Sequence, residues 1–221
     1  ERIQLGGERR DITIIFSDIE GFTTLSETLP PEEVVSLLNA YLTPMTDIVF
    51  RHGGTLDKYI GDAVMALYGA PLDLPDHADR ACRAALEMMT ALKALKDEAW
   101  VAHGWPDLRI RIGVNSGTMA IGNMGSDIHK DYTAIGDGVN IAARLESLAN
   151  PGGICISGTV FDQLSGKLDV GFADLGEVKV KNIERPIRVY RIVLDPAVKR
   201  PRRTAWTRRR RLVICAICAL L

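Results

Sequence analysis

Two aspartates in this sequence stand where they could bind divalent cations. Asp18 closely follows the β-branched run 11–16, and Asp62 lies between two further apolar runs, 55–60 and 63–68. A two-residue Gly-Asp link between strands is typical of a tight primed turn, so we expect Asp62 at a rigid hairpin tip. If the strands are neighbours, the carboxylates meet, and Mg²⁺ favours one or two carboxylates completed by water and phosphates. The pair predicts a site for two Mg²⁺ or Mn²⁺ ions, which could activate a hydroxyl and neutralise a polyphosphate.

A lysine on the same hairpin is the second candidate for chemistry. On a period of two, Leu56, Lys58 and Ile60 share one face, which puts a charge where the pattern calls for an apolar residue. The plainer alternatives are ordinary turn chemistry for Asp62 and an edge-strand lysine whose stem lies along apolar surface. Partners elsewhere in the chain decide between these interpretations.

A third group of polar residues lies on a predicted helix. Residues 132–135 favour a strand, and Val139–Leu148 has helical spacing with a core stripe of Ile141, Ala142, Leu145 and Leu148. Asn140 and Arg144 are four residues apart, so they share one face of this helix near its start. A solvated helix face is the alternative interpretation of this pair.

The elements that must position these residues alternate between helix and strand. Pro30 and Pro31 begin a helix that ends at Gly53, and Asp76 can cap a second long helix. Residues 108–114 alternate as a half-buried strand, and 115–117 are expected to turn into a second hairpin arm. Alternation combined with hairpins predicts an α/β (α+β) fold with a ferredoxin-like βαββαβ core and an added C-terminal αβ portion.

The domain boundaries follow from composition. Residues 1–10 are polar and are expected to be a linker from an upstream region, 11–194 the folded domain, and 195–221 a basic tail. Removing the eight Lys and Arg of 199–221 leaves 19 basic against 28 acidic residues, a formal charge of −9. An acidic body argues against a nucleic-acid-binding surface.

The cysteines and the C-terminal tail indicate the cellular compartment in which we expect the protein. Cys82 and Cys155 lie among apolar residues and are expected to be buried thiols, which suits a reducing compartment, and the CxxC of Cys215 and Cys218 lacks further metal-ligand spacing. Arg208–Arg211 precede ten apolar residues, which resembles the cytoplasmic flank and the beginning of a truncated membrane span. We expect a cytoplasmic domain with a possible membrane tether in a longer protein. A buried or disordered tail is the alternative.

Four ordered motifs, read together, resemble the class III nucleotidyl cyclase catalytic domain. They are FSDIEGFT, LDKYIGDAVMALYGAP, RIGVNSG and YTAIGDGVNIAARLE, and the resemblance covers nearly everything from Arg9 to Leu194. It implies an enzyme that closes ATP or GTP into a cyclic nucleotide, working as a head-to-tail homodimer with sites shared between two chains. His129 departs from the pattern, because relatives usually carry an arginine before the DYT motif.

The resemblance also implies roles for individual residues. Asp18, Asp62 and the backbone of Ile19 would hold the metal ions, Asn140 would orient the ribose, and Arg144 would stabilise the transition state. The phosphates would contact Arg111, Lys181 and the turn formed by Gly21, Phe22 and Thr23. The metal aspartates of one chain would work with the base-reading and transition-state residues of the other.

The resemblance further assigns the reading of the base to Lys58 and Thr133. In the family a lysine with an Asp or Thr reads adenine, whereas a Glu with a Cys commonly reads guanine. Lys58 can donate to N1 of adenine, but guanine presents a donor there, which an ammonium cannot accept. We therefore expect an adenylyl cyclase acting on ATP, similar to the Thr-containing subgroup, some of whose members respond to bicarbonate. The alternatives are a guanylyl cyclase and a catalytically silent nucleotide-binding regulatory module.

Overall fold

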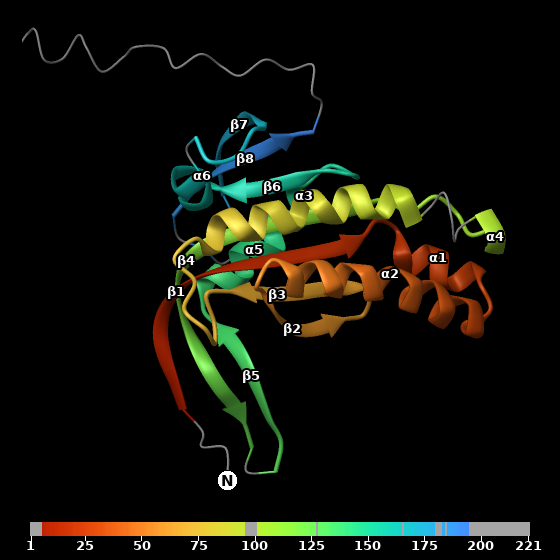
Figure 1. Cartoon of the computed structure of the whole chain (residues 1–221), viewed down its shortest axis with the longest axis horizontal. Helices are drawn as coiled ribbons and strands as arrows, with labels where there is room; N and C mark the ends of the chain where they lie inside the picture. Colours follow the sequence, from red (N-terminus) through yellow and green to blue (C-terminus); the bar gives the residue numbers. More distant parts are fainter. Residues whose placement is uncertain are drawn as a thin grey trace, which may run out of the picture.

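One mixed β-sheet with helices on both faces organises the protein (Figure 1). The computed structural model describes residues 6–95, 101–126, 128–164, 166–179, 183 and 185–194. Its elements are β1 (Gly6–Ile19), α1 (Phe22–Thr28), α2 (Pro31–Arg51), β2 (Thr55–Ile60), β3 (Ala63–Tyr68), α3 (His77–Leu95), α4 (Val101–His103), β4 (Ile110–Gly125), β5 (Lys130–Ile135), α5 (Asp137–Leu148), β6 (Ile154–Ser157), α6 (Gly158–Leu164), β7 (Gly171–Val178) and β8 (Ile187–Val193).

The strand order confirms the predicted architecture. The sheet runs β2-β3-β1-β4-β6-β8-β7, and β5 pairs with β4 off this path. Within it, β2, β3, β1 and β4 are antiparallel neighbours, as a ferredoxin-like βαββαβ core requires. The elements from β5 to β8 form the added C-terminal portion. The N-terminal half of β1, the C-terminal half of β4 and β5 project together from the body (Figure 1).

Alternation along β1 explains the two cores. Ile12, Ile14 and Phe16 are buried on the face that packs against α5, while Ile15 and Ile19 are buried on the face covered by α2, α3 and α6. Successive strand residues point to opposite faces, so a run of β-branched residues serves a strand buried on both sides. The two long helices predicted from the sequence, α2 and α3, each bury one apolar stripe.

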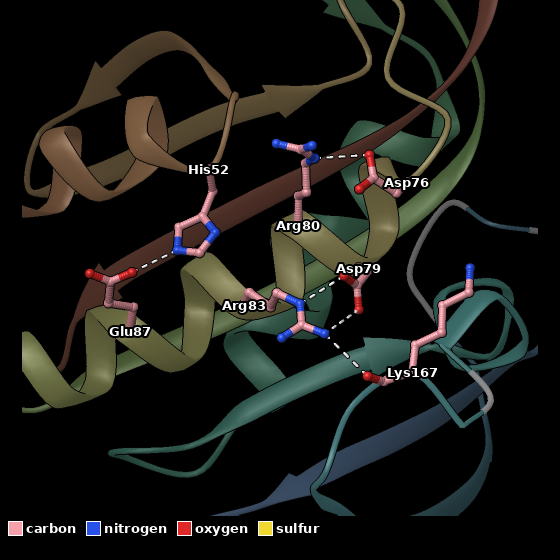
Figure 2. Close-up of polar contacts among 7 residues, drawn as sticks. All are labelled: His52, Asp76, Asp79, Arg80, Arg83, Glu87 and Lys167. Atoms are coloured by element: carbon pink, nitrogen blue, oxygen red, sulfur yellow. Dashed lines mark hydrogen bonds and ion pairs between the residues drawn. The ribbon is translucent and has the colours of Figure 1, made fainter.

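Polar contacts fasten α3 to its neighbours (Figure 2). His52, which caps α2, contacts Glu87 of α3 with 2.6 Å between Nε2 and Oε2. Arg83 donates both to Asp79 one turn earlier and, over 3.1 Å, to the carbonyl of Lys167 beyond α6. Exposed pairs of this kind stabilise little individually. Their effect is to tie α3 to α2 and to the segment that follows α6.

Two boundary predictions were wrong. Residues 6–10, predicted as a linker, belong to β1, and the turn predicted at 115–117 lies inside the unbroken strand β4. Both errors have one cause, because β1 pairs with β4 residue by residue from Gly6 opposite Asn123 to Ile19 opposite Ile110. A continuous partner satisfies the backbone of turn-forming residues and keeps them extended.

The structure confirms the two predicted buried thiols. Cys82 and Cys155 are buried thiols. Cys215, Cys218 and the whole segment 195–221 lie outside the described residues, as does Lys181. Within the described ranges, the helices are too short or too polar to cross a bilayer.

Candidate active site

Asp18 and Asp62 meet at one end of the sheet, as the sequence predicts. Gly61 and Asp62 form the two-residue turn between β2 and β3, and Gly61 has the positive φ that such a turn needs, 66°. The backbone N–H of Ile19 donates to Asp62 Oδ2 over 2.9 Å, which fixes the hairpin tip against the end of β1. Asp18 directly precedes Ile19, so the carboxylates of Asp18 and Asp62 both lie beside the Ile19 backbone.

The electrostatics of this pair favour a bound cation. Burial, followed by the negative charge of Asp18, raises the pKa of Asp62 to about 6. A carboxyl group whose ionised form is disfavoured by a neighbouring carboxylate is stabilised when a divalent cation binds both. Within the described residues there is no cluster of three or more His, Cys, Asp or Glu side chains. Two carboxylates, with water and phosphate oxygens as further ligands, nevertheless suit Mg²⁺.

The raised pKa predicts a stability change in the metal-free protein. Folded protein keeps the Asp62 proton up to pH about 6, whereas the unfolded chain releases it near 3.8. Stability therefore falls as pH rises through this window, and Asp62→Asn, which still accepts from Ile19, removes the loss. We expect a gain of about 1 kcal/mol at pH 7.5, reduced because the side chain is half exposed, or about 2–4 °C in Tm.

Thermal unfolding with a chelator present measures this gain. It should be largest at pH 7.5 and shrink as the pH falls through this window, vanishing below about pH 3, where Asp62 is protonated in both states of the protein. A lower Tm for the variant at pH 7.5 would mean that the ionised carboxylate stabilises the fold through the Ile19 amide.

Arg111 joins Asp18 to Glu146 of α5. It lies directly opposite Asp18 across β1 and β4, and its Nη2 donates to Asp18 Oδ2 over 3.0 Å. Its Nε lies 3.1 Å from Oε1 of Glu146. Burial raises the pKa of Glu146, an effect that the charge of Arg111 opposes. Arg111 is thus held between Asp18 and Glu146.

Sequence reasoning missed Glu146. The helical pattern assigned Leu148 to the core of α5, but Leu148 is 41% exposed and Glu146 is buried. The helix turns Glu146 towards the sheet, where Arg111 neutralises it. The one available signal was that Glu146 falls on the stripe side of the helix, directly after Leu145.

Lys58 and Thr133 converge on a residue that the sequence analysis did not single out. Lys58 Nζ lies 3.2 Å from Asp57 Oδ1, and Thr133 Oγ1 donates to Asp57 Oδ2 over 2.7 Å. The two base-reading candidates, on β2 and β5, therefore lie together in one chain.

The predicted face of Lys58 was wrong in one respect. Leu56 pairs with Ala66 and Lys58 with Met65, so a β-bulge at Asp57 interrupts the alternation. Leu56 packs into the core under α2 and α3, whereas Lys58 lies opposite Met65, which belongs to the core under α5. An extra residue shifts every later side chain to the other face of the sheet.

The remaining candidates occupy several places. Asn140 and Arg144 are both exposed on α5. Gly21, with a left-handed φ of 70°, turns the chain from β1 into α1, where Phe22 packs against the core and Thr23 is exposed. Among the described residues, the hydrogen bonds of Asp18 and Asp62 go to Arg111 and Ile19 and not to either of these sets. His129 is exposed at the β4–β5 turn, 3.5 Å from Asp131.

Known proteins resemble this chain closely. The family model described as the adenylate and guanylate cyclase catalytic domain matches residues 7–193. Adenylate cyclase 1 of Rhizobium meliloti (strain 1021) is 38% identical over 84% of this chain and 28% of its own length. Adenylate cyclase of Anabaena cylindrica is 36% identical over 87% of this chain and 39% of its own. The chain thus spans less than half the length of these relatives.

Solved structures agree with the sequence matches. The adenylyl cyclase CyaB from P. aeruginosa is 38% identical, with a TM-score of 0.81, covering 87% of this chain and 98% of that one. The guanylyl cyclase Cya2 is 37% identical, with a TM-score of 0.80 and the same coverage. The sheet order, the pair of carboxylates and these matches together show that the chain belongs to the class III adenylate and guanylate cyclase catalytic-domain family.

Proposed function

We propose that this domain is an adenylyl cyclase that converts ATP to 3′,5′-cyclic AMP and pyrophosphate. The carrying observation is that Lys58 and Thr133 lie together at Asp57. Overall likeness does not separate the two substrates, because CyaB and Cya2 match almost equally. The base assignment therefore rests on donors and acceptors. An ammonium donates to N1 of adenine but has no lone pair for the N1 proton of guanine.

The residues of this chain would align ATP and stabilise the transition state, and none of them would act as the nucleophile. The 3′-hydroxyl of ATP attacks its own α-phosphorus, and the bond to pyrophosphate breaks, so the protein has to supply orientation and charge stabilisation. Asn140 would orient the ribose, and Arg144 would stabilise charge at the α-phosphorus. Arg111, Lys181 and the Gly21–Thr23 turn would hold the phosphates. Divalent cations held by Asp18, Asp62 and the Ile19 backbone would activate the hydroxyl and neutralise the phosphates.

We further propose that each site is shared between two chains of a head-to-tail homodimer. Asn140 and Arg144 are exposed on α5, whereas Asp18 is engaged by Arg111 at the end of β1. Exposed polar residues on α5 are available to a second chain's nucleotide. Two equivalent sites follow from the symmetry of such a dimer.

Product identity tests the proposal. Purified protein is incubated with Mg²⁺ or Mn²⁺ and with ATP or GTP, and the products are separated and identified by mass. We expect cyclic AMP from ATP at a much higher rate than cyclic GMP from GTP, and a specific activity that falls on dilution. Preferential cyclic GMP would make the domain a guanylyl cyclase. No cyclic product from either nucleotide would favour a silent nucleotide-binding module.

A further inference from the structure

We propose that Asp57 is a positioning residue that makes Thr133 a hydrogen-bond acceptor and thereby sets the choice of adenine over guanine. The inference rests on the proposed function and deepens it, since it explains how a threonine, which can both donate and accept, discriminates between two purines.

The backbone gives Asp57 an unusual place. It is the additional residue of the β2 bulge, between the pairs Leu56–Ala66 and Lys58–Met65. Its side chain is 0% exposed, although β2 lies at one edge of the sheet. Carboxylates are rarely buried unless they are paired, and bulges often re-aim a side chain next to an active site. The burial of Asp57 thus calls for specific partners.

Each carboxylate oxygen of Asp57 has a different partner. Oδ1 lies 3.2 Å from Lys58 Nζ, and Oδ2 accepts the Thr133 hydroxyl proton over 2.7 Å. The second contact joins β2 to β5, 76 residues apart in sequence. One buried acid therefore connects both side chains that would face the base.

The proton count then decides what Thr133 can offer. A threonine hydroxyl has one proton and two lone pairs. Because that proton is donated to Asp57, only lone pairs remain for a ligand. The exocyclic amine of adenine is a donor and can use them, whereas O6 of guanine is an acceptor and would face lone pairs. The Lys58 ammonium, which forms an ion pair with Asp57 Oδ1, has three N–H groups, one of which can reach N1 of adenine.

Asp57→Asn tests this with almost no change in volume. The asparagine amide can donate to Thr133 Oγ1, which frees the hydroxyl proton for O6 of guanine. We expect the ratio of kcat/KM for ATP to that for GTP to fall about tenfold, the effect of one hydrogen bond of about 1.4 kcal/mol. A purely structural role would lower both values equally and leave the ratio unchanged, which would overturn the inference.

Asp174→Asn is the matched control. Asp174 also lies at a strand irregularity, in β7, but its side chain is 41% exposed and pairs with Arg188. Its substitution should leave the ATP-to-GTP ratio unchanged. Thr133→Val should lower the ratio, and Asp57→Asn added to it should lower the ratio no further. An additional fall in the double variant would route the effect of Asp57 through Lys58 and contradict our assignment.

Two further measurements keep the test decisive. If Asp57→Asn fails to fold, Thr133→Ser, which keeps the hydroxyl, should retain the ratio that Thr133→Val loses, and equal ratios would overturn the inference. If the wild-type protein forms no cyclic product, the proposed function fails, but the affinities for fluorescently labelled ATP and GTP give the same ratio. The two failures are therefore distinguishable.

Discussion

Replacing Asp18 by asparagine is expected to lower cyclic AMP production by about 1,000-fold, because cations at this site would contribute several kcal/mol of charge stabilisation. The substitution keeps the shape of the side chain and an acceptor for Arg111, which lies 3.0 Å away in the native protein. The loss would therefore reflect the missing charge. Initial rates at saturating ATP and over a range of Mn²⁺ concentrations measure it.

A neighbouring acid provides the control for Asp18. Glu20 lies two residues further along the chain, and its carboxylate pairs with Arg109 at 3.3 Å. Glu20→Gln should retain nearly the wild-type rate, because Glu20 is outside the proposed metal-binding set. If Asp18→Asn kept most of its activity while folding normally, this carboxylate would not hold the catalytic cations.

Mixing two inactive variants is expected to restore activity. Asp62→Asn removes a proposed metal ligand, and Arg144→Ala removes the proposed transition-state arginine, so each homodimer should be nearly inactive. In a mixed dimer one site carries both changes and the other carries neither. Random pairing makes half of the dimers mixed, so we expect about a quarter of the wild-type specific activity.

The control for this mixture uses two changes on the same side of the site. Asp18→Asn mixed with Asp62→Asn leaves every site without one proposed metal ligand, and no recovery should follow. Activity is measured after the variants are co-incubated long enough to exchange subunits. If Asp62→Asn and Arg144→Ala also fail to recover although mixed dimers are detected, each site belongs to a single chain.

Local patterns in the sequence determined much of this protein. The β-branched run of β1, the Gly-Asp turn and the apolar spacing of α2, α3 and α5 each depend on nearby residues, and each of these elements formed, although β1 begins earlier than predicted. The approach of Asp18 and Asp62 also followed from local signals, since one residue ends a strand and the other lies at a hairpin tip. The contact between the Ile19 N–H and Asp62 was not predicted, since the resemblance implied only that the Ile19 backbone would hold a metal ion.

Tertiary structure alone decided the pairings across the sheet. The path of β4 through residues 115–117 depends on β1, and the burial of Glu146 depends on Arg111 from another strand. The bulge that buries Asp57 depends on the register between β2 and β3. Strand register and the neutralisation of a buried charge involve residues distant in sequence, so a periodic pattern read along one segment does not contain them. The sequence therefore determined which residues could do the chemistry, and the fold decided which partners hold them in place.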